Sequence, residues 1–473
     1  MLWFTLSRNE EQTLAVQIEE ELRKRILASQ LRENEKLPSS RELAHSLGVS
    51  RNTVNEAYEQ LLMEGYIYRI PRSGTYVSKG LAFKKERRQL PPFEKQIHQP
   101  EEPIIDFKAS QPALDHFPRQ AWANTYKQVC LTANEDVFGY QSALGHVQLR
   151  EAIANYLGRL RGVEALPDQI VITTGATQAL SLLTTLLQTV GEKVCVEDPV
   201  TEEMRSIFTE AGAKIEPIHT DEHGINPAHL PKNHKPRFVF TIPSHQFPLG
   251  AILPVKRRIE LVEYARRMET YIIEDDYDSE FIYEGTPVQA MQSLDTEHVI
   301  YLGTFSKILS PSLRIGYMVL PYHLVERAKK QKWFTDRHTS SLEQVALAMF
   351  IKEGLFEKHI RRMKKLYAKR RKVLVEAIQA TFSQCDIIGQ AAGMHLVVRF
   401  NNVNRIHAHD LVNHHVHAII VEHFSIEKGQ HQNELVLGYG HLQEEDILEG
   451  IKRLKKSTHF MCCRIRRVVV YIR

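Results

Sequence analysis

One lysine could do covalent chemistry in residues 301–317, YLGTFSKILSPSLRIGY, where Lys307 lies among small and apolar residues. A free lysine amine has a pKa of about 10.4 and is a poor nucleophile at neutral pH, because it is protonated. Surroundings that disfavour the ammonium form allow such an amine to form a Schiff base with an aldehyde. Thr304 and Ser306 add hydroxyl groups on its N-terminal side. Taken alone, Lys307 is better explained as a surface amine.

Groups that could bind a phosphate occur in an upstream motif and in the same segment as Lys307. The motif TTGATQAL puts Gly175, Ala176 and Thr177 at a predicted strand-to-helix turn, where free backbone amides and the helix dipole attract an anion. Arg314, seven residues after Lys307, can form two parallel hydrogen bonds to a phosphate. An aldehyde that also carries a phosphate, pyridoxal 5′-phosphate (PLP), would use both the lysine and this anion clamp.

The same cofactor needs an acid beside its pyridine nitrogen and a donor to its phenolate oxygen. The strand-like segment YIIEDDYDSEF carries Asp275 and Tyr277, which lie on one face of a strand because they are two residues apart. Asp275 could keep the ring nitrogen protonated, and Tyr277 could donate to the phenolate. Gln246, in PSHQFPLG, is a weaker candidate for the same oxygen.

Each of these motifs has a plainer explanation. GAT could be a simple helix start, and DDYD could be a solvated strand end. Their order along the chain, each at the end of a predicted strand, favours one cofactor site over several unrelated features.

The elements that would position these residues alternate along the chain. Apolar runs typical of strands (QIVIT, KVCVED, FVFTIP, YIIEDD, HVIYLG, GYMVL) are separated by helical patterns such as TQALSLLTTLLQ. This alternation predicts an α/β fold with a mostly parallel sheet covered by helices, over residues of about 130–330. From about 331 to 456, a long helical stretch followed by further strands predicts a smaller α+β subdomain.

The first eighty residues have a different pattern. The pattern of residues 13–31 predicts an amphipathic helix. Two short helices are predicted to follow, with cap-like serines at their starts and glycines at their ends. YIYRI and TYVS, separated by PRSG, predict a two-stranded hairpin. This order predicts a winged helix over residues 9–79, followed by a linker rich in charge and proline over 80–103.

A winged helix presents the N-terminal residues of its second helix-turn-helix helix to the major groove of DNA. At that position, Arg51 and Asn52 can distinguish guanine and adenine by paired hydrogen bonds. Isolated arginines on short helices are also common on solvated faces. The candidate DNA-binding residues, taken with the preceding helix start and the hairpin tip, are Arg41, Arg51, Asn52, Thr53, Arg72 and Gly74.

Composition excludes several classes of protein. No window approaches eighteen uncharged apolar residues and the first residues do not form a signal peptide, so we expect a cytoplasmic protein. A net charge of +4 means that DNA binding must come from a local surface. The five cysteines and the histidines of residues 407–423 lack metal-site spacing, and we predict no metal. Residues 457–473 predict a basic tail of unknown role.

Two family resemblances account for the motifs. LPSSRELAHSLGVSRNTVNEAYEQLLMEG resembles the winged helix of GntR regulators, and residues 104–456, with PSHQFPLG, IIEDDYDSEF, GTFSK and LRIGY, resemble fold type I aminotransferases. The fusion resembles the MocR/GabR class of transcription regulators. The resemblance implies a cofactor bound to Lys307, a head-to-tail homodimer on double-stranded DNA, and sensing of an amine or amino acid through an external aldimine.

The chain departs from the pattern of that class at the effector site. Where relatives commonly have ExPGY, followed two residues later by an arginine in the member that senses γ-aminobutyrate, this chain has EDPVTEEMR. Thr201 replaces the aromatic residue, and Glu203 replaces that arginine. No arginine occurs between Arg405 and Arg453, where aminotransferases hold the substrate carboxylate. We therefore expect an effector other than γ-aminobutyrate. An active aminotransferase and a repressor that has lost its cofactor are the alternatives.

Overall fold

The computed structural model describes residues 4–7, 12–81, 103–109, 111–286 and 288–468, and side chains through Ser457. The chain divides into two compact units, Met1–His98 and Gln99–Arg473. Most of the predicted linker lies outside the described residues. None of the described helices is long and apolar enough to span a membrane.

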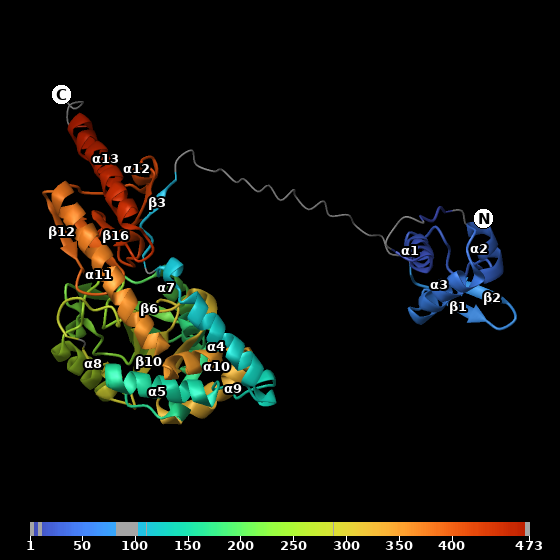
Figure 1. Ribbon diagram of the computed structural model, residues 1–473, viewed down its shortest axis with the longest axis horizontal. Coiled ribbons are helices and arrows are strands. Elements are labelled where there is room, and N and C mark those ends of the chain that lie inside the picture. The colour runs from blue at the N-terminus through green and yellow to red at the C-terminus, as the bar shows by residue number, and fades with distance from the viewer. Residues whose placement is uncertain (1–3, 8–11, 82–102, 110, 287, 469–473) are drawn as a thin grey trace. The chain divides into compact units, whose positions relative to one another are not determined.

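The first unit is a winged helix (Figure 1). Its elements are α1 (Leu14–Leu27), α2 (Ser40–Leu47), α3 (Arg51–Met63), β1 (Ile67–Ile70) and β2 (Gly74–Val77). Local side chains start the helices, because Ser39 forms a capping box with Glu42 and Ser50 accepts a hydrogen bond from the amide of Thr53. Gly48 ends α2 with a φ of +66°.

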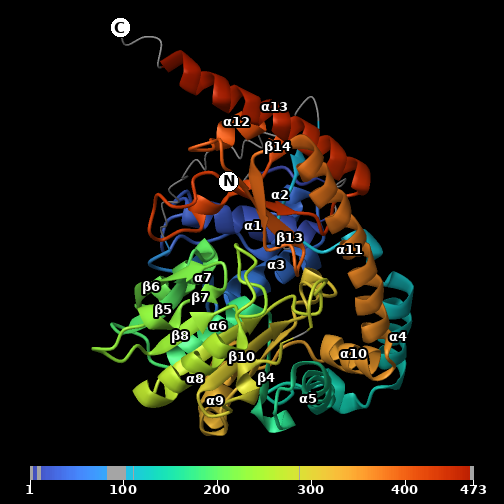
Figure 2. The same cartoon turned by 90° about the vertical axis from the view of Figure 1, so that its left-hand side faces the viewer.

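The second unit is built around an eight-stranded sheet in the order β4-β11-β10-β9-β8-β5-β6-β7. Figure 2 shows several of these strands side by side. The strands are β4 (Ile170–Thr173), β5 (Lys193–Asp198), β6 (Lys214–Asp221), β7 (Gly224–Ile225), β8 (Phe238–Thr241), β9 (Tyr271–Asp276), β10 (Val299–Thr304) and β11 (Gly316–Val319). The central pairs from β6 to β10 are parallel. The predicted α/β class is confirmed.

Two strands reverse this direction: β7, which is antiparallel to β6 at one edge of the sheet, and β11. β11 is antiparallel to both β10 and β4, and Thr304 pairs with Gly316. The connection between β10 and β11 is only residues 305–315, which is too short for a helical crossover to a parallel strand. Lys307 therefore lies in the loop between two antiparallel neighbours.

Helices cover the sheet and connect it to the smaller part. They are α4 (Arg119–Thr132), α5 (Val147–Arg161), α6 (Ala176–Leu186), α7 (Glu202–Glu210), α8 (Val255–Met268), α9 (Val325–Thr335) and α10 (Ser341–Lys352). Short 3-10 helices also occur at Leu114–His116, Glu135–Phe138, Pro167–Gln169, Pro227–His229, Met291–Ser293, Pro311–Leu313, Tyr322–Leu324 and Val421–His423. α6 packs against α7 and α9, and α10 packs against α4 and α5.

The smaller part contains an antiparallel sheet in the order β12-β13-β16-β15. Its elements are α11 (Leu355–Thr381), β12 (Cys385–Ile388), β13 (His395–Phe400), α12 (Ala408–Val412), β14 (Val416–His417), β15 (Ile419–Ile420), β16 (Glu434–Gly438) and α13 (Glu444–Val468). Helices α11 and α13 lie side by side (Figure 1). The early strand β3 (Ile105–Asp106) pairs in parallel with β14, so the start of this unit joins its last third.

Two boundaries differ from the sequence prediction. The predicted subdomain starts at about residue 331, but α10 packs on the larger part, and Gly354, with a φ of +72°, separates it from α11. The predicted tail starts at 457, but α13 continues as far as Val468. Residues 457–468 contain neither glycine nor proline to end a helix.

Candidate cofactor site and DNA-binding surface

Lys307 is half-buried and follows the carboxyl end of β10. Burial lowers the pKa of its amine, and the positive charge of Lys108 acts in the same direction. The carboxylates of Asp278, Asp275 and Glu203 oppose this shift. The lysine thus lies within electrostatic reach of several charged groups and holds its proton less tightly than a surface lysine does.

Asp275 is buried near the carboxyl end of β9 and is 1% exposed. Its Oδ1 has no hydrogen-bond partner among the described residues. Burial raises the pKa of Asp275 to about 7, and the charges of Asp276, Asp278 and Glu197 also raise it. A buried carboxyl with a free oxygen is a poor arrangement for a protein by itself. It suits a positively charged N–H of a ligand.

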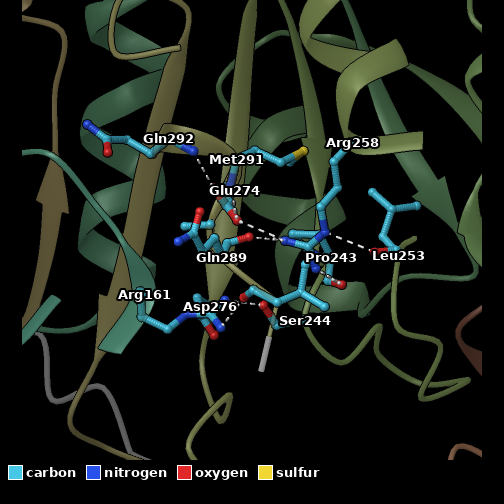
Figure 3. A network of polar contacts seen from close by, with 12 residues as sticks. Arg161, Pro243, Ser244, Leu253, Arg258, Glu274, Asp276, Gln289, Met291 and Gln292 are labelled. Carbon is cyan, nitrogen blue, oxygen red and sulfur yellow. Dashed lines mark hydrogen bonds and ion pairs between the residues drawn. The ribbon is translucent and has the colours of Figure 1, made fainter. Parts of the chain in front are cut away.

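The neighbours of Asp275 on β9 belong to a separate network of polar contacts (Figure 3). Glu274 accepts hydrogen bonds from the amides of Met291 (3.0 Å) and Gln292 (3.1 Å). Asp276 forms an ion pair with Arg161 at 2.9 Å. Because strand residues alternate between faces, these contacts fix the strand from one side and leave Asp275 on the other. The two buried carboxylates are stabilised because each has a partner.

Tyr277 lies beside a histidine that sequence reasoning missed. Its hydroxyl is 3.1 Å from both the carbonyl oxygen and Nδ1 of His245. His245 Nδ1 is also 3.0 Å from Asp278 Oδ2, and both residues are buried. The signal was present in the motifs PSHQ and DDYD, but nothing local pairs positions 245 and 278. The pair holds the Tyr277 hydroxyl in place.

Gln246 is buried, and its side chain is occupied by the backbone. Its Nε2 donates to the carbonyl oxygens of Pro199 and Phe247, both at 2.9 Å, and its Oε1 accepts from the Leu249 amide at 3.0 Å. With both amide hydrogens in use, a bond from Gln246 to the cofactor would require one of these contacts to break. The geometry gives Gln246 a role in shaping the loop 246–249.

The predicted phosphate turn has the form of an anion cradle. Gly175 has a φ of +110° at the start of α6, and no side chain caps this helix. The amides of Ala176 and Thr177 therefore occupy first-turn positions that lack intrahelical partners. A Cβ at Gly175 would lie 3.4 Å from both terminal nitrogens of Arg314, so the guanidinium covers the turn closely.

The hydroxyl groups near the lysine have different surroundings. Thr304 is buried, and its Oγ1 accepts a hydrogen bond from the Ser306 amide at 3.2 Å. Ser306 is half-buried, whereas the side chain of Thr177 is exposed. An open cavity of about 720 Å³ adjoins the cradle and is lined in part by Thr174, Ser312 and Arg314.

The residues fit PLP as a set. The cradle offers amides and a guanidinium for a phosphate, and Asp275 offers a free buried oxygen for the ring nitrogen. Lys307, within electrostatic reach of Asp275, offers the amine for an aldehyde. Groups of the right charge are thus available for each end of such a molecule.

The fully buried arginine of the C-terminal subdomain already bonds to the protein and is not available to a carboxylate. Arg370 is 1% exposed there, but it donates to the Gly440 carbonyl at 2.6 Å and to Gln443 Oε1 at 3.2 Å. The charges near Lys307 that sequence reasoning missed are Lys108 and Asp278. Lys108 lies close to β3 in the chain, and the pairing of β3 to β14 across the unit could not be predicted locally.

The winged helix exposes the predicted DNA-binding residues at the starts of its helices and at the hairpin. Arg51 and Asn52 are exposed at the start of α3, and Arg41 is exposed at the start of α2. Arg72, with a φ of +62°, is exposed at the hairpin tip. A hollow of about 1310 Å³ lies between the helices and the hairpin, and its lining includes Lys36, Ser40, Arg51, Asn55, Arg69 and Gly74.

Thr53 and Gly74 are less available. Thr53 is half-buried, and its Oγ1 is 2.8 Å from the Ser50 hydroxyl at the helix cap. Gly74 has a φ of +133°, and a Cβ there would lie 2.8 Å from Cε of Lys36. These two residues shape the surface, whereas the exposed arginines and Asn52 are accessible to a ligand.

Comparisons with known proteins match both units. Residues 14–77 match the gntR family of bacterial regulatory proteins, and residues 102–454 match aminotransferase class I and II. The chain is 37% identical to the probable rhizopine catabolism regulatory protein MocR of Rhizobium meliloti, over 84% of this chain and 83% of that protein. It is 28% identical to the pyridoxine biosynthesis transcriptional regulator PdxR of Corynebacterium glutamicum, over 94% and 96%.

Solved structures match the second unit. The kynurenine aminotransferase of Pyrococcus horikoshii, in complex with PMP, aligns with a TM-score of 0.70 and 27% identity, over 76% of this chain and 92% of that chain. The α-aminoadipate aminotransferase LysN of Thermus thermophilus, complexed with N-(5′-phosphopyridoxyl)-L-leucine, aligns with a TM-score of 0.69 and 26% identity, over 76% and 93%.

Proposed function

Because the chain belongs to the helix-turn-helix transcription regulators that join a GntR domain to an aminotransferase class I and II domain, we propose that it senses a small amine or amino acid and adjusts its binding to an operator. The aminotransferase class I fold family binds PLP. One observation supports the proposal above all: Lys307, with a lowered pKa, lies within electrostatic reach of a buried carboxyl that has a free oxygen.

Each residue of the site has a role in this proposal. When bound, PLP supplies an aldehyde that reacts reversibly with primary amines and a ring that absorbs near-visible light. Lys307 provides the amine that holds the cofactor, and its lowered pKa increases the unprotonated fraction. Asp275 accepts the N–H of the ring and keeps a proton on that nitrogen. The Tyr277 hydroxyl, whose hydrogen goes to the His245 carbonyl oxygen in this structure, would turn that hydrogen to the phenolate, and Arg314 with the first turn of α6 would bind the phosphate.

The charges around Lys307 support an effector with both an amine and an anionic group. The amine of an effector would bind beside Lys307, and Lys108 is a cation within electrostatic reach of that lysine. Glu203 adds a negative charge within the same reach, since it raises the pKa of Lys307. This arrangement differs from the arginines expected to hold the carboxylate in aminotransferases and in the γ-aminobutyrate sensor.

A homodimer is supported by an exposed aromatic cluster, which we define as Tyr140, Trp333, Phe334 and Arg337. Tyr140 is 75% exposed and Phe334 is 72% exposed. The Arg337 guanidinium lies 3.6 Å from the centre of the Tyr140 ring and 5.5 Å from that of Trp333. Exposed apolar groups that adjoin in this way mark protein interfaces. We propose that a second copy covers this cluster in a head-to-tail dimer.

The winged helix contacts double-stranded DNA in this proposal. Arg51 and Asn52 reach base edges in the major groove from the start of α3. Arg41 contacts a phosphate, and Arg72 lies beside the minor groove. Their exposure at helix starts and at the hairpin tip supports these roles.

Reconstitution with PLP tests the cofactor role of Lys307. The wild-type protein should acquire an absorption band near the visible range, and Lys307→Ala should lose that band while still binding DNA in a mobility-shift assay. The exposed lysine of α9, Lys330, gives a matched control, because Lys330→Ala should keep both properties. A wild-type protein that stays colourless with PLP would refute the sensing function.

The alternative is an active aminotransferase with an attached DNA-binding domain. The similarity to kynurenine aminotransferase over 76% of the chain favours it. Steady multi-turnover conversion of an amino donor and a keto acid, at rates of about 1 s⁻¹ or more, would establish that activity. Single-turnover chemistry would agree with the sensor.

A further inference from the structure

A buried lysine of α9 holds the turn that precedes α6, and it has no part in the roles proposed above. Lys332 is 0% exposed, although most lysines lie at protein surfaces. Its Nζ donates to Asp336 Oδ1 at 2.7 Å, to Thr339 Oγ1 at 3.2 Å and to Gln178 Oε1 at 3.3 Å. Three acceptor residues match the three protons of an ammonium group.

Gln178 connects this lysine to the phosphate cradle. Gln178 is the third residue of α6, and its Oε1 also accepts the amide N–H of Thr174 at 2.8 Å. Its Nε2 donates to Asp336 Oδ2 at 2.7 Å. The side chain therefore spans Gly175 and ties the first turn of α6 to the residue before that glycine.

Thr339 connects the same lysine to the sheet. Its Oγ1 donates to the carbonyl oxygen of Ile172, in β4, at 3.4 Å. Lys332 thus joins the end of β4 and the start of α6, the two elements that the cradle links. The amides of Ala176 and Thr177 have their positions set by contacts on both sides.

The charge of Lys332 also affects how favourably a phosphate can approach the first turn of α6. With the lysine present, the carboxylate of Asp336 is neutralised by an ion pair. Burial lowers the pKa of the Lys332 amine, and the hydrogen bond to Asp336 raises it. Without the lysine, Asp336 would present an uncompensated negative charge to Gln178, in the first turn of the helix that the phosphate must approach.

We propose that Lys332 is a positioning residue for the phosphate of PLP, acting through Gln178 and Thr174 and not by direct contact. This inference rests on the proposed cofactor site. It predicts a specific effect on the phosphate, because the hydrogen bonds of Lys332 involve none of the residues assigned to the aldehyde or to the ring nitrogen.

The test compares PLP with pyridoxal, which has the same aldehyde and ring but no phosphate. The full-length apo-protein is titrated with each compound, and dissociation constants are measured from the near-visible absorption. In Lys332→Met, affinity for PLP should fall by about ten- to a hundredfold, the effect of losing a hydrogen bond to a charged group. Affinity for pyridoxal should stay close to that of the wild type, and Lys330→Met should change neither value.

Gln178→Leu gives a second test if the methionine variant does not fold. It removes the link to Thr174 but leaves Lys332 paired with Asp336 and Thr339, and it should also weaken PLP binding more than pyridoxal binding. Equal losses for the two compounds, or no loss for PLP, would overturn the role of Lys332. A wild-type protein that binds neither compound would instead overturn the cofactor site itself.

Discussion

Replacing Asp275 with asparagine should stabilise the apo-protein at neutral pH and weaken its binding of PLP. Burial raises the pKa of this carboxyl from 3.8 to about 7, and in the unfolded chain it returns to its ordinary value. Between these pH values the folded protein binds more protons than the unfolded chain, so the free energy of unfolding falls as the pH rises. The side-chain amide of the Asp275→Asn variant has no proton to lose, so the variant lacks this dependence.

The size of this change in the free energy of unfolding follows from the pKa shift of Asp275. A difference of about 3 pKa units, at 1.36 kcal/mol per unit, corresponds to roughly 4 kcal/mol at pH 7 and above. At pH 4 the two proteins should differ little. Chemical denaturation of the apo-protein, followed by tryptophan fluorescence, measures this difference, because Trp122 and Trp333 both lie in the second unit.

Adding PLP should reverse the order of stability. A protonated ring nitrogen pairs with the Asp275 carboxylate but not with an amide, so the holo-wild type should be more stable than the holo-variant. Glu197, whose pKa burial also raises to about 7, is present in both proteins, and removing the Asp275 charge also removes the repulsion between these two carboxylates. If the apo-form of Asp275→Asn is less stable than the apo-wild type at pH 8, the reasoning is refuted.

Two further predictions concern the surfaces. Arg51→Ala should weaken operator binding by about 1–3 kcal/mol and relax the preference for particular bases. Arg41→Ala should weaken binding to all DNA sequences alike and lower the slope of log affinity against log salt concentration by about 1. Competition mobility shifts at several salt concentrations separate the two, and equal effects on operator and random DNA would contradict a base contact by Arg51. Phe334→Glu should shift the protein toward monomer in sedimentation velocity, with Tyr322→Glu, at another exposed aromatic position, as control. An unchanged sedimentation coefficient would exclude the aromatic cluster as the interface.

Local sequence signals predicted much of the fold. The serines at positions 39 and 50 cap their helices as expected, because capping depends on residues within one turn. The apolar runs became strands of the sheet, and the fold class and family are confirmed by the comparisons. Alternation along β9 also explains why Asp275 and Asp276 have different surroundings.

The missed features join segments that are far apart in the chain. His245 pairs with Asp278, and Lys332 of α9 pairs with Gln178 of α6. The order of the strands in the sheet brings these segments together, and no local periodicity defines that order. The antiparallel β11 and the packing of α10 on the larger part have the same origin. The roles of Lys307, Asp275 and Arg314 toward the cofactor remain predictions that spectroscopy can test.

The short connection between β10 and β11 carries both Lys307 and Arg314, so in the proposed site the covalent bond and the anion contact would reach the cofactor from one segment of chain. When the first contact forms, the second group is already confined nearby, and its effective concentration is high. Capture and loss of the cofactor should therefore each be a concerted event, and a small disturbance of this one connection would loosen both attachments together.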